Sequence, residues 1–234
     1  MTKINIFWGM REDAIRQKVV ETALSLLGIR EGTIDHKQLI VDVYNGQAKL
    51  PRGYALKPTD PWCAAFVSVV GIMLGISDVI LPEVGCGPMI ELYKAQGRWE
   101  ELDSYIPDPG DIVMYDWDAQ KGECLGAPDH VGLVEWVKGN RIGVIEGNYD
   151  NQVKRREICV EYVKIRGFCV PDYASLVQGF TDVSEGAWYR DEVARAAELG
   201  IILGNGDGTF APEQPITRAE AAAMMVRLYD ILRK

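Results

Sequence analysis

The chain has 234 residues and a mass of 26.1 kDa; 47% of its residues are hydrophobic and 25% are charged. These proportions are typical of a folded globular protein and leave little room for long disordered tracts. The formal net charge of −9 argues against nucleic acid as a partner, because phosphate binding depends on clustered Lys and Arg. The same charge disfavours nonspecific adhesion to anionic membranes and wall polymers, so binding to such a polymer would have to be stereospecific.

The N-terminal segment MTKINIFWGMREDAIRQKVV lacks the apolar run of roughly 7–15 residues that follows the basic start of a secretory signal. No stretch of about 20 apolar residues occurs in the sequence, so we expect no membrane insertion. Synthesis in the cytosol and release there are the expectation.

Five cysteines occupy positions 63, 86, 124, 159 and 169. Their odd number and the absence of CxxC or zinc-like spacing predict a fold that neither disulfides nor zinc organise. Cys86, Cys124, Cys159 and Cys169 are interpreted as reduced, structural cysteines. No cofactor is expected.

Apolar residues recur at three-to-four spacing over 11–28, which predicts a helix closed by Gly28. Residues 32–58 are punctuated by Gly and Pro and are predicted to be mostly loop, with a short helical stretch near QLIVDVYN. The polar surroundings of His36 there indicate a surface histidine.

The stretch TDPWCAAFVSVVGIMLG, residues 59–75, predicts a helix with Asp60 as N-cap and Pro61 as its first residue. Cys63 then lies in the first turn, where unpaired N–H groups and the positive end of the helix dipole favour a thiolate. Two interpretations of Cys63 stay open on this evidence: a small packing residue or a nucleophile.

After a second helix near 87–97 the pattern changes to the alternation typical of strands. PDPGDIVMYDW (107–117), DHVGLVEWV (129–137) and RIGVIEGNY (141–149) each predict a strand, and KGN joins the last two in a tight hairpin. VKRREICVEYVKIRGFCVP (153–171) predicts two more strands. Helices followed by antiparallel strands indicate an α+β domain.

A cysteine nucleophile needs a general base within hydrogen-bond reach and a third group that orients the base. His130 begins an alternating strand, and Gly132 beside it is expected to leave room for a substrate backbone. The alternative is a histidine that is merely hydrogen-bonded at a hairpin edge. On the returning strand Glu146 and Asn148 are two apart and share a face, so either can accept a hydrogen bond from the His130 ring.

In this order, WCAAFVS, PGDIV, DHVGLVE and IEGN resemble a CHAP domain, the cysteine- and histidine-dependent amidohydrolase/peptidase module of the papain-like NlpC/P60 group. The resemblance implies that Cys63 is the nucleophile, His130 the base and Glu146 the orienting carboxylate, with Asn148 a supporting or alternative group. It also implies acyl transfer on peptidoglycan, at the amide between muramic acid and L-alanine or within stem and bridge peptides.

No metal site is expected. Some CHAP relatives bind calcium through an Asp-rich loop shortly before the cysteine, but the corresponding YALKPTDP has only Asp60. A second segment, NGDGTF, could suggest a calcium loop, yet Phe210 stands where an EF-hand loop needs glycine. We interpret NGDGTF as a turn.

The composition changes at about 172–180, which separates a catalytic domain at 1–173 from a linker at 174–180 and a small all-α unit at 181–234. The last unit has a predicted helix near 188–199 and another from 218 onward. The second of these helices opens with a capping box formed by Thr217 and Glu220.

In that unit FTDV, W188, GIILGNGDGTF and ITRAE resemble a single S-layer homology (SLH) repeat. The family binds secondary cell-wall polysaccharide, and the resemblance points to Arg218 and, second, to Trp188. The alternative for Trp188 is a packing role in the small core. Arg218 opposes the dipole at the start of its helix, a cost of roughly 0.3–1 kcal/mol that an anionic ligand would offset.

SLH relatives usually carry three repeats that pack around a pseudo-threefold axis. One repeat of two helices cannot bury its own apolar face, which consists of Ala222, Met225, Val226, Tyr229 and Leu232. We therefore expect three chains to assemble as a homotrimer.

Together these motifs predict a peptidoglycan hydrolase with a wall-targeting tail. Without a visible signal peptide it resembles a phage endolysin that crosses the membrane through a holin and acts on the Gram-positive wall; an autolysin exported by another route is the nearest variant. The alternative from another class is a non-catalytic wall-binding or assembly protein with an inactive CHAP-like domain. A cytosolic papain-like protease or transferase would leave the tail unexplained.

Overall fold

A computed structural model describes residues 7, 10–101, 105–119, 126–177, 179–205 and 208–233. Cys124 and the central Gly206 and Asp207 of the NGDGTF turn lie outside this description. The chain divides into two compact units. The larger unit is Arg16–Asp172, and the smaller unit joins Met1–Ile15 to Tyr173–Lys234.

Helices come first along the chain, as the apolar spacing predicts. Their bounds are α1 Glu12–Ser25, η1 His36–Val41, α2 Asp42–Asn45, η2 Pro51–Gly53, α3 Cys63–Leu74 and α4 Cys86–Ala95. Among the described residues, none of the helices combines the length and the apolar character that crossing a bilayer requires.

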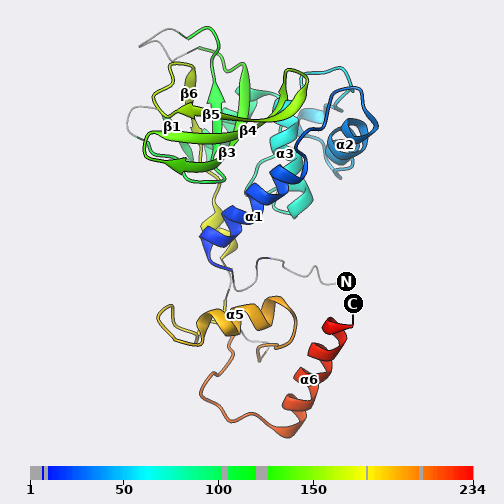
Figure 1. Ribbon diagram of the computed structural model, residues 1–234, viewed down its shortest axis with the longest axis vertical. Coiled ribbons are helices and arrows are strands. Elements are labelled where there is room, and N and C mark those ends of the chain that lie inside the picture. Colours follow the sequence, from blue (N-terminus) through cyan, green and yellow to red (C-terminus); the bar gives the residue numbers. More distant parts are fainter. Residues whose placement is uncertain are drawn as a thin grey trace. The chain divides into compact units, whose positions relative to one another are not determined.

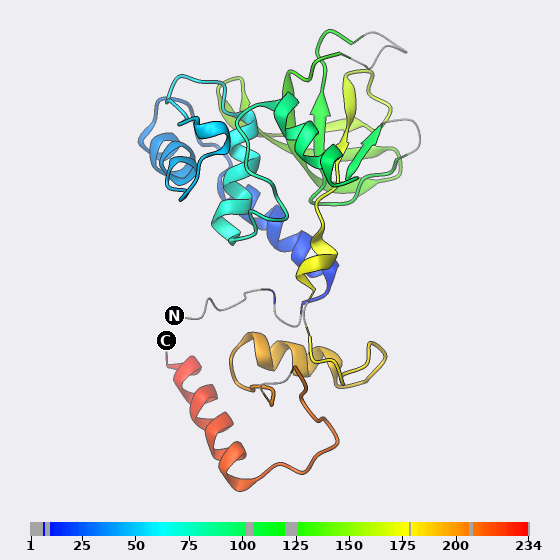
Figure 2. The ribbon, with the colours of Figure 1, turned by 180° about the vertical axis from the view of Figure 1, so that it is seen from behind.

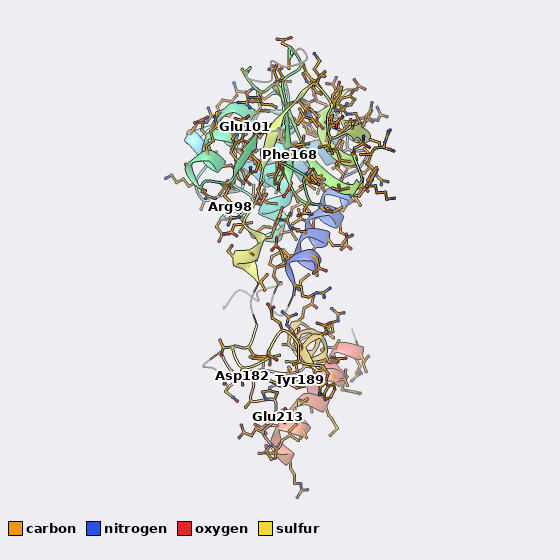
Figure 3. The ribbon with its side chains drawn as sticks, turned by 90° about the vertical axis from the view of Figure 1, so that its left-hand side faces the viewer. Arg98, Glu101, Phe168, Asp182, Tyr189 and Glu213 are labelled. Atoms are coloured by element: carbon orange, nitrogen blue, oxygen red, sulfur yellow. The ribbon has the colours of Figure 1, made fainter. Side chains whose placement is uncertain are left out.

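Six antiparallel strands then form one sheet in the order β1-β6-β2-β3-β4-β5, which confirms the α+β class (Figure 1). The strands are β1 Trp99–Glu101, β2 Ile112–Tyr115, β3 His130–Lys138, β4 Arg141–Tyr149, β5 Gln152–Cys159 and β6 Ile165–Cys169. The predicted hairpin is present, with Lys138 opposite Arg141. Figure 3 labels Glu101 and Phe168 at the β1–β6 edge of this sheet.

Helix α3 is buried along most of its length and packs against β3 and β4 (Figure 1). Its apolar sequence explains this position, because a helix that is hydrophobic all round belongs in a core. Gly71 allows close approach of the next segment, since a Cβ there would lie 2.7 Å from the Cβ of Ile80. Seen from behind, the blue and cyan helices lie to one side of the green strands (Figure 2). The helix thus holds its first residue, Cys63, beside the sheet.

The expectation that His36 lies on the surface was wrong, because its side chain is buried. It begins η1, which packs on α3, and its ring lies 4.8 Å from the indole ring of Trp62, centroid to centroid. Its Nδ1 accepts a hydrogen bond from the Gly32 N–H. Burial lowers the pKa of His36, which favours the neutral ring. The error arose because the segment has polar neighbours in sequence but apolar neighbours in space.

The smaller unit contains η3 Tyr173–Leu176, α5 Arg190–Glu198 and α6 Arg218–Leu232. The capping box at the start of α6 is present: the Glu220 N–H donates to Thr217 Oγ1 and the Thr217 N–H to Glu220 Oε2. Asp182, labelled in Figure 3, accepts hydrogen bonds from the N–H groups of Phe210 and Ala211. Its carboxylate thereby closes the segment that precedes α6.

Candidate active site

Cys63 is the first residue of α3, and the prediction of Asp60 as the N-cap of this helix is wrong. Trp62 is the N-cap, and Asp60 instead accepts hydrogen bonds from the Lys57 N–H and the Tyr54 hydroxyl. These bonds hold Asp60 in a turn and keep it away from the helix end. As the first helical residue, Cys63 has an N–H with no partner inside the helix, where it can face an oxyanion.

His130 is the first residue of β3 and is paired with Tyr115 of β2. Its ring lies among aromatic rings, with centroids 5.6 Å from Trp117 and 6.0 Å from Tyr149. The side chain is almost fully buried. The strand and the surrounding rings therefore hold the imidazole in a fixed position, as expected.

Glu146 reaches His130 from the neighbouring strand: Oε1 lies 3.6 Å from His130 Nε2. Gly132 makes this approach possible, because a Cβ at Gly132 would lie 2.6 Å from Glu146 Cγ. The expectation that Gly132 leaves room for a substrate was thus wrong. The space beside it is filled by the Glu146 side chain, which is fully buried.

Arg156 of β5 pairs with the same carboxylate, a contact that the sequence analysis missed. Its Nη2 donates to Glu146 Oε1 at 2.9 Å and its Nε to Oε2. The guanidinium also lies 4.4 Å from the Tyr149 ring centroid. Burial acts to lower the pKa of Arg156, but the hydrogen bond to Glu146 and the charge of Glu146 raise it overall. In the antiparallel register of β4 and β5, Arg156 lies opposite Val144 and so reaches Glu146 diagonally; the alternation of the predicted strand 153–171 was the signal that could have revealed this pair.

Asn148 does not continue the alternation of β4. The register shifts between Glu146 and Tyr149, and Asn148 takes a left-handed φ of 57°. The assumption that Glu146 and Asn148 share a strand face was therefore wrong. The Asn148 Oδ1 is buried and has no hydrogen-bond partner among the described residues, whereas Glu146 contacts the imidazole.

The pKa of Cys63 is held well below that of an ordinary thiol. The main cause is a hydrogen bond from Cys86, whose Sγ lies 3.8 Å from Cys63 Sγ. His130 lowers the pKa further by hydrogen bonding and by its charge, while burial of Cys63 acts in the opposite direction. The thiolate is therefore the favoured form, as a nucleophile requires.

After Arg156, Cys86 is the second residue near Cys63 and His130 that was not predicted from the sequence. It was interpreted as a structural cysteine. It is the first residue of α4. Its pKa is raised, first by the hydrogen bond to Cys63 and then by burial. The two sulfurs meet where the first residues of α3 and α4 come together, and no sequence spacing signals this.

The two residues predicted to bind polysaccharide are both exposed, and they do not line a common groove. Trp188 is 86% exposed, so a packing role for it is wrong. Arg218 is the first residue of α6, as predicted, and is also exposed. A groove of about 430 Å³ is lined by residues from 202 to 227, including Glu220 and Arg227, but neither Trp188 nor Arg218 contributes to it.

Within the described ranges, no three His, Cys, Asp or Glu side chains gather as ligands for a metal ion. What the site offers is acid–base and nucleophilic chemistry: a thiol, an imidazole and a carboxylate on three different elements. These are the three kinds of group, a nucleophile, a base and a group that orients the base, that acyl transfer by a cysteine needs.

Curated proteins are similar to short stretches of this chain. The outer membrane protein SlpA of Deinococcus radiodurans is 44% identical over 63 residues, which is 27% of this chain and 5% of that protein. The surface-layer 125 kDa protein of Lysinibacillus sphaericus is 40% identical over 52 residues, 22% of this chain and 4% of that protein. The chain thus spans about one twentieth of the length of these relatives.

Among solved structures, the crystal structure of Ly7917 matches 68% of this chain and 62% of its own, with 18% identity and a TM-score of 0.40. A second structure of Ly7917, with the hydrolyzing product of MDP, gives a TM-score of 0.39 at 17% identity over 67% and 62% of the two chains.

Family models match two separate parts of the sequence. Residues 55–148 match the CHAP domain and contain all four predicted catalytic residues, while residues 179–222 match the S-layer homology domain and contain Trp188 and Arg218. The chain therefore combines one region that matches the CHAP domain with a second region that matches the S-layer homology domain.

Proposed function

We propose that this protein is a peptidoglycan hydrolase that cleaves an amide bond by cysteine-dependent acyl transfer. The observation that carries the proposal is the arrangement around His130: its Nε2 lies 3.6 Å from Glu146, and it lowers the pKa of Cys63 at the start of α3. The CHAP match over 55–148 supports the same chemistry.

In this mechanism the Cys63 thiolate attacks the amide carbonyl and forms a tetrahedral intermediate. His130 protonates the leaving amine, and water activated by His130 then hydrolyses the thioester. Glu146 orients the ring and stabilises the imidazolium, while Arg156 positions Glu146. The N–H groups at the start of α3, including that of Cys63, are proposed to stabilise the oxyanion.

The SLH domain is proposed to hold the enzyme on the Gram-positive wall by binding secondary cell-wall polysaccharide. Exposed Trp188 and Arg218 are the proposed contacts. The SLH match over 179–222 and the similarity to surface-layer proteins support this role. Release by a holin, as for a phage endolysin, stays a prediction from the sequence.

We further propose that α6 takes part in a homotrimer. Much of its apolar surface is exposed: Met225, Val226, Leu228, Tyr229 and Leu232. Two further copies would supply the neighbours that SLH repeats need. Light scattering at micromolar concentration is expected to give three times the chain mass, and the mass of a single chain would contradict the trimer.

The function is tested by mass spectrometry of the products that the purified protein releases from Gram-positive sacculi. A hydrolase of this kind releases free stem peptides or shorter peptide fragments, and their masses identify the bond. The rival, a non-catalytic wall-binding protein, would sediment with the sacculi and release nothing. That outcome would overturn the proposal.

A further inference from the structure

Cys86 and Cys63 are two buried thiols that face each other at the ends of two helices. Cys63 is the first residue of α3 and Cys86 the first residue of α4. Their Sγ atoms are 3.8 Å apart, and the side chains are only 5% and 8% exposed. The mechanism above uses only one of the two thiols.

Hydrogen bonds between α3 and the segment before α4 hold the two sulfurs in contact. Ser68 of α3 donates its hydroxyl to the Glu83 carbonyl and accepts from the Glu83 N–H, at 2.7 and 2.8 Å. The Glu83 carboxylate in turn accepts from the Val84 and Gly85 N–H groups. These bonds fix the segment before α4 against α3, so the two thiols stay close.

A disulfide needs its sulfurs about 2.05 Å apart, so closure from 3.8 Å requires an approach of about 1.8 Å. Rotation of two side chains about their Cα–Cβ bonds can supply a shift of this size. Cys169 offers a comparison within the same unit, because it is a buried cysteine at the end of β6.

We propose that Cys86 is a resolving thiol that reversibly switches off Cys63 when a peroxide oxidises the site. The Cys63 thiolate attacks hydrogen peroxide, the O–O bond breaks, and Cys63 sulfenic acid and hydroxide form. Cys86 then attacks the sulfenic sulfur, which expels hydroxide and forms the Cys63–Cys86 disulfide. In total, two thiols lose two electrons and two protons, and one peroxide becomes two waters.

The chemistry of each thiol agrees with its assigned role. Cys63 has the lowered pKa and reacts first with the oxidant, whereas Cys86 keeps its proton until Cys63 is oxidised. A dithiol reverses the switch by exchange, becoming a cyclic disulfide itself. The effect on activity rests on the proposed function, because a Cys63 sulfur held in a disulfide cannot attack an amide.

The test treats the full chain with hydrogen peroxide, then cleaves it after glutamate without reduction. Such cleavage at Glu83 and Glu91 separates the two thiols, because it leaves Cys86 on peptide 84–91 and Cys63 on peptide 32–83. The expected product is a linked pair of these peptides that has lost two hydrogen atoms. Hydrolysis of sacculi is measured on the same samples before and after dithiothreitol, each relative to the untreated protein.

We expect the native chain to lose most of its activity with peroxide and to regain it with dithiothreitol. In Cys86→Ala the loss is expected to persist after dithiothreitol, because Cys63 proceeds to sulfinic acid without a resolving thiol. The control Cys169→Ala is expected to behave like the native chain. Over-oxidation of Cys63 to the same extent in the native chain and in Cys86→Ala, without linked peptides, would overturn the proposal.

Failure of the proposed function would give a different result. If the linked peptides form but the untreated native chain does not hydrolyse sacculi, thiol pairing is supported and the hydrolase assignment is contradicted. If hydrolysis is present and peroxide abolishes it equally and irreversibly in all three proteins, the hydrolase stands and the switch is contradicted.

Discussion

Arg156, on the edge strand β5, forms a two-point ion pair with Glu146, and Oε1 of the same carboxylate lies 3.6 Å from His130 Nε2. A carboxylate that is fully buried needs such a partner, because an uncompensated buried charge is strongly destabilising. The pair therefore links the stability of the β4–β5 hairpin to the orientation of the catalytic base. The consequences of this link for stability and for hydrolysis can be measured with single substitutions.

Arg156→Met is expected to lower the free energy of unfolding by about 3–5 kcal/mol, because it leaves the buried Glu146 charge unpaired. Urea denaturation measures the change. The matched control is Arg141→Met, which removes the partner of Glu157 in a half-exposed pair and should cost less than about 1 kcal/mol. Equal effects of the two substitutions would show that Glu146 does not depend on Arg156.

Gly132→Ala is expected to impair the site, because its Cβ would lie 2.6 Å from Glu146 Cγ. Displacement of Glu146 should reduce hydrolysis and cost about 1–3 kcal/mol of stability, as overpacking generally does. Gly87→Ala is the control, since a Cβ at Gly87 meets open space. Native activity and stability in Gly132→Ala would contradict the described packing of Glu146.

The lowered pKa of Cys63 predicts how its reactivity depends on pH. The thiolate is the reactive form, so alkylation by iodoacetamide should stay fast as the pH falls through the ordinary thiol pKa of about 8.5 and slow only at lower pH. Cys86→Ala removes the largest stabilising contact, so its profile should move to higher pH. Peptide mass spectrometry measures the rates, and coincident profiles of the two proteins would exclude this role of Cys86.

Trp188→Ala and Arg218→Ala should each weaken sedimentation with sacculi about tenfold, which corresponds to about 1.4 kcal/mol. Both side chains are exposed, so the helical circular dichroism signal should not change. The background variant Cys63→Ala prevents digestion of the sacculi during the assay. Arg195→Ala, which removes another exposed arginine, is the control. Unchanged binding in both variants would show that the polysaccharide site lies elsewhere.

The features that the sequence predicts correctly are those encoded by neighbouring residues. The β3–β4 hairpin follows from alternation on both sides of a short turn, and the α6 capping box follows from the spacing of Thr217 and Glu220. His130 and Glu146 meet because this hairpin fixes their relative positions. Local patterns therefore suffice to bring two candidate catalytic residues together.

The features that it misses depend on contacts distant in sequence. His36 is buried by packing on Trp62, and Cys86 reaches Cys63 because the N-terminal ends of α3 and α4 meet in space. The shift in register after Glu146, which turns Asn148 out of the alternation, is a local irregularity without a marker in composition. The errors at His36 and Cys86 came from treating a residue's sequence neighbours as its spatial neighbours.

The central claim is that Cys63 performs nucleophilic catalysis on peptidoglycan. The most direct measurement is the rate at which fragments are released from sacculi by the native chain, by Cys63→Ala and by the buried-cysteine control Cys169→Ala. The account predicts a rate at least about 10³-fold lower for Cys63→Ala alone, as for other enzymes that lose their nucleophile. Release by Cys63→Ala at the native rate would contradict it.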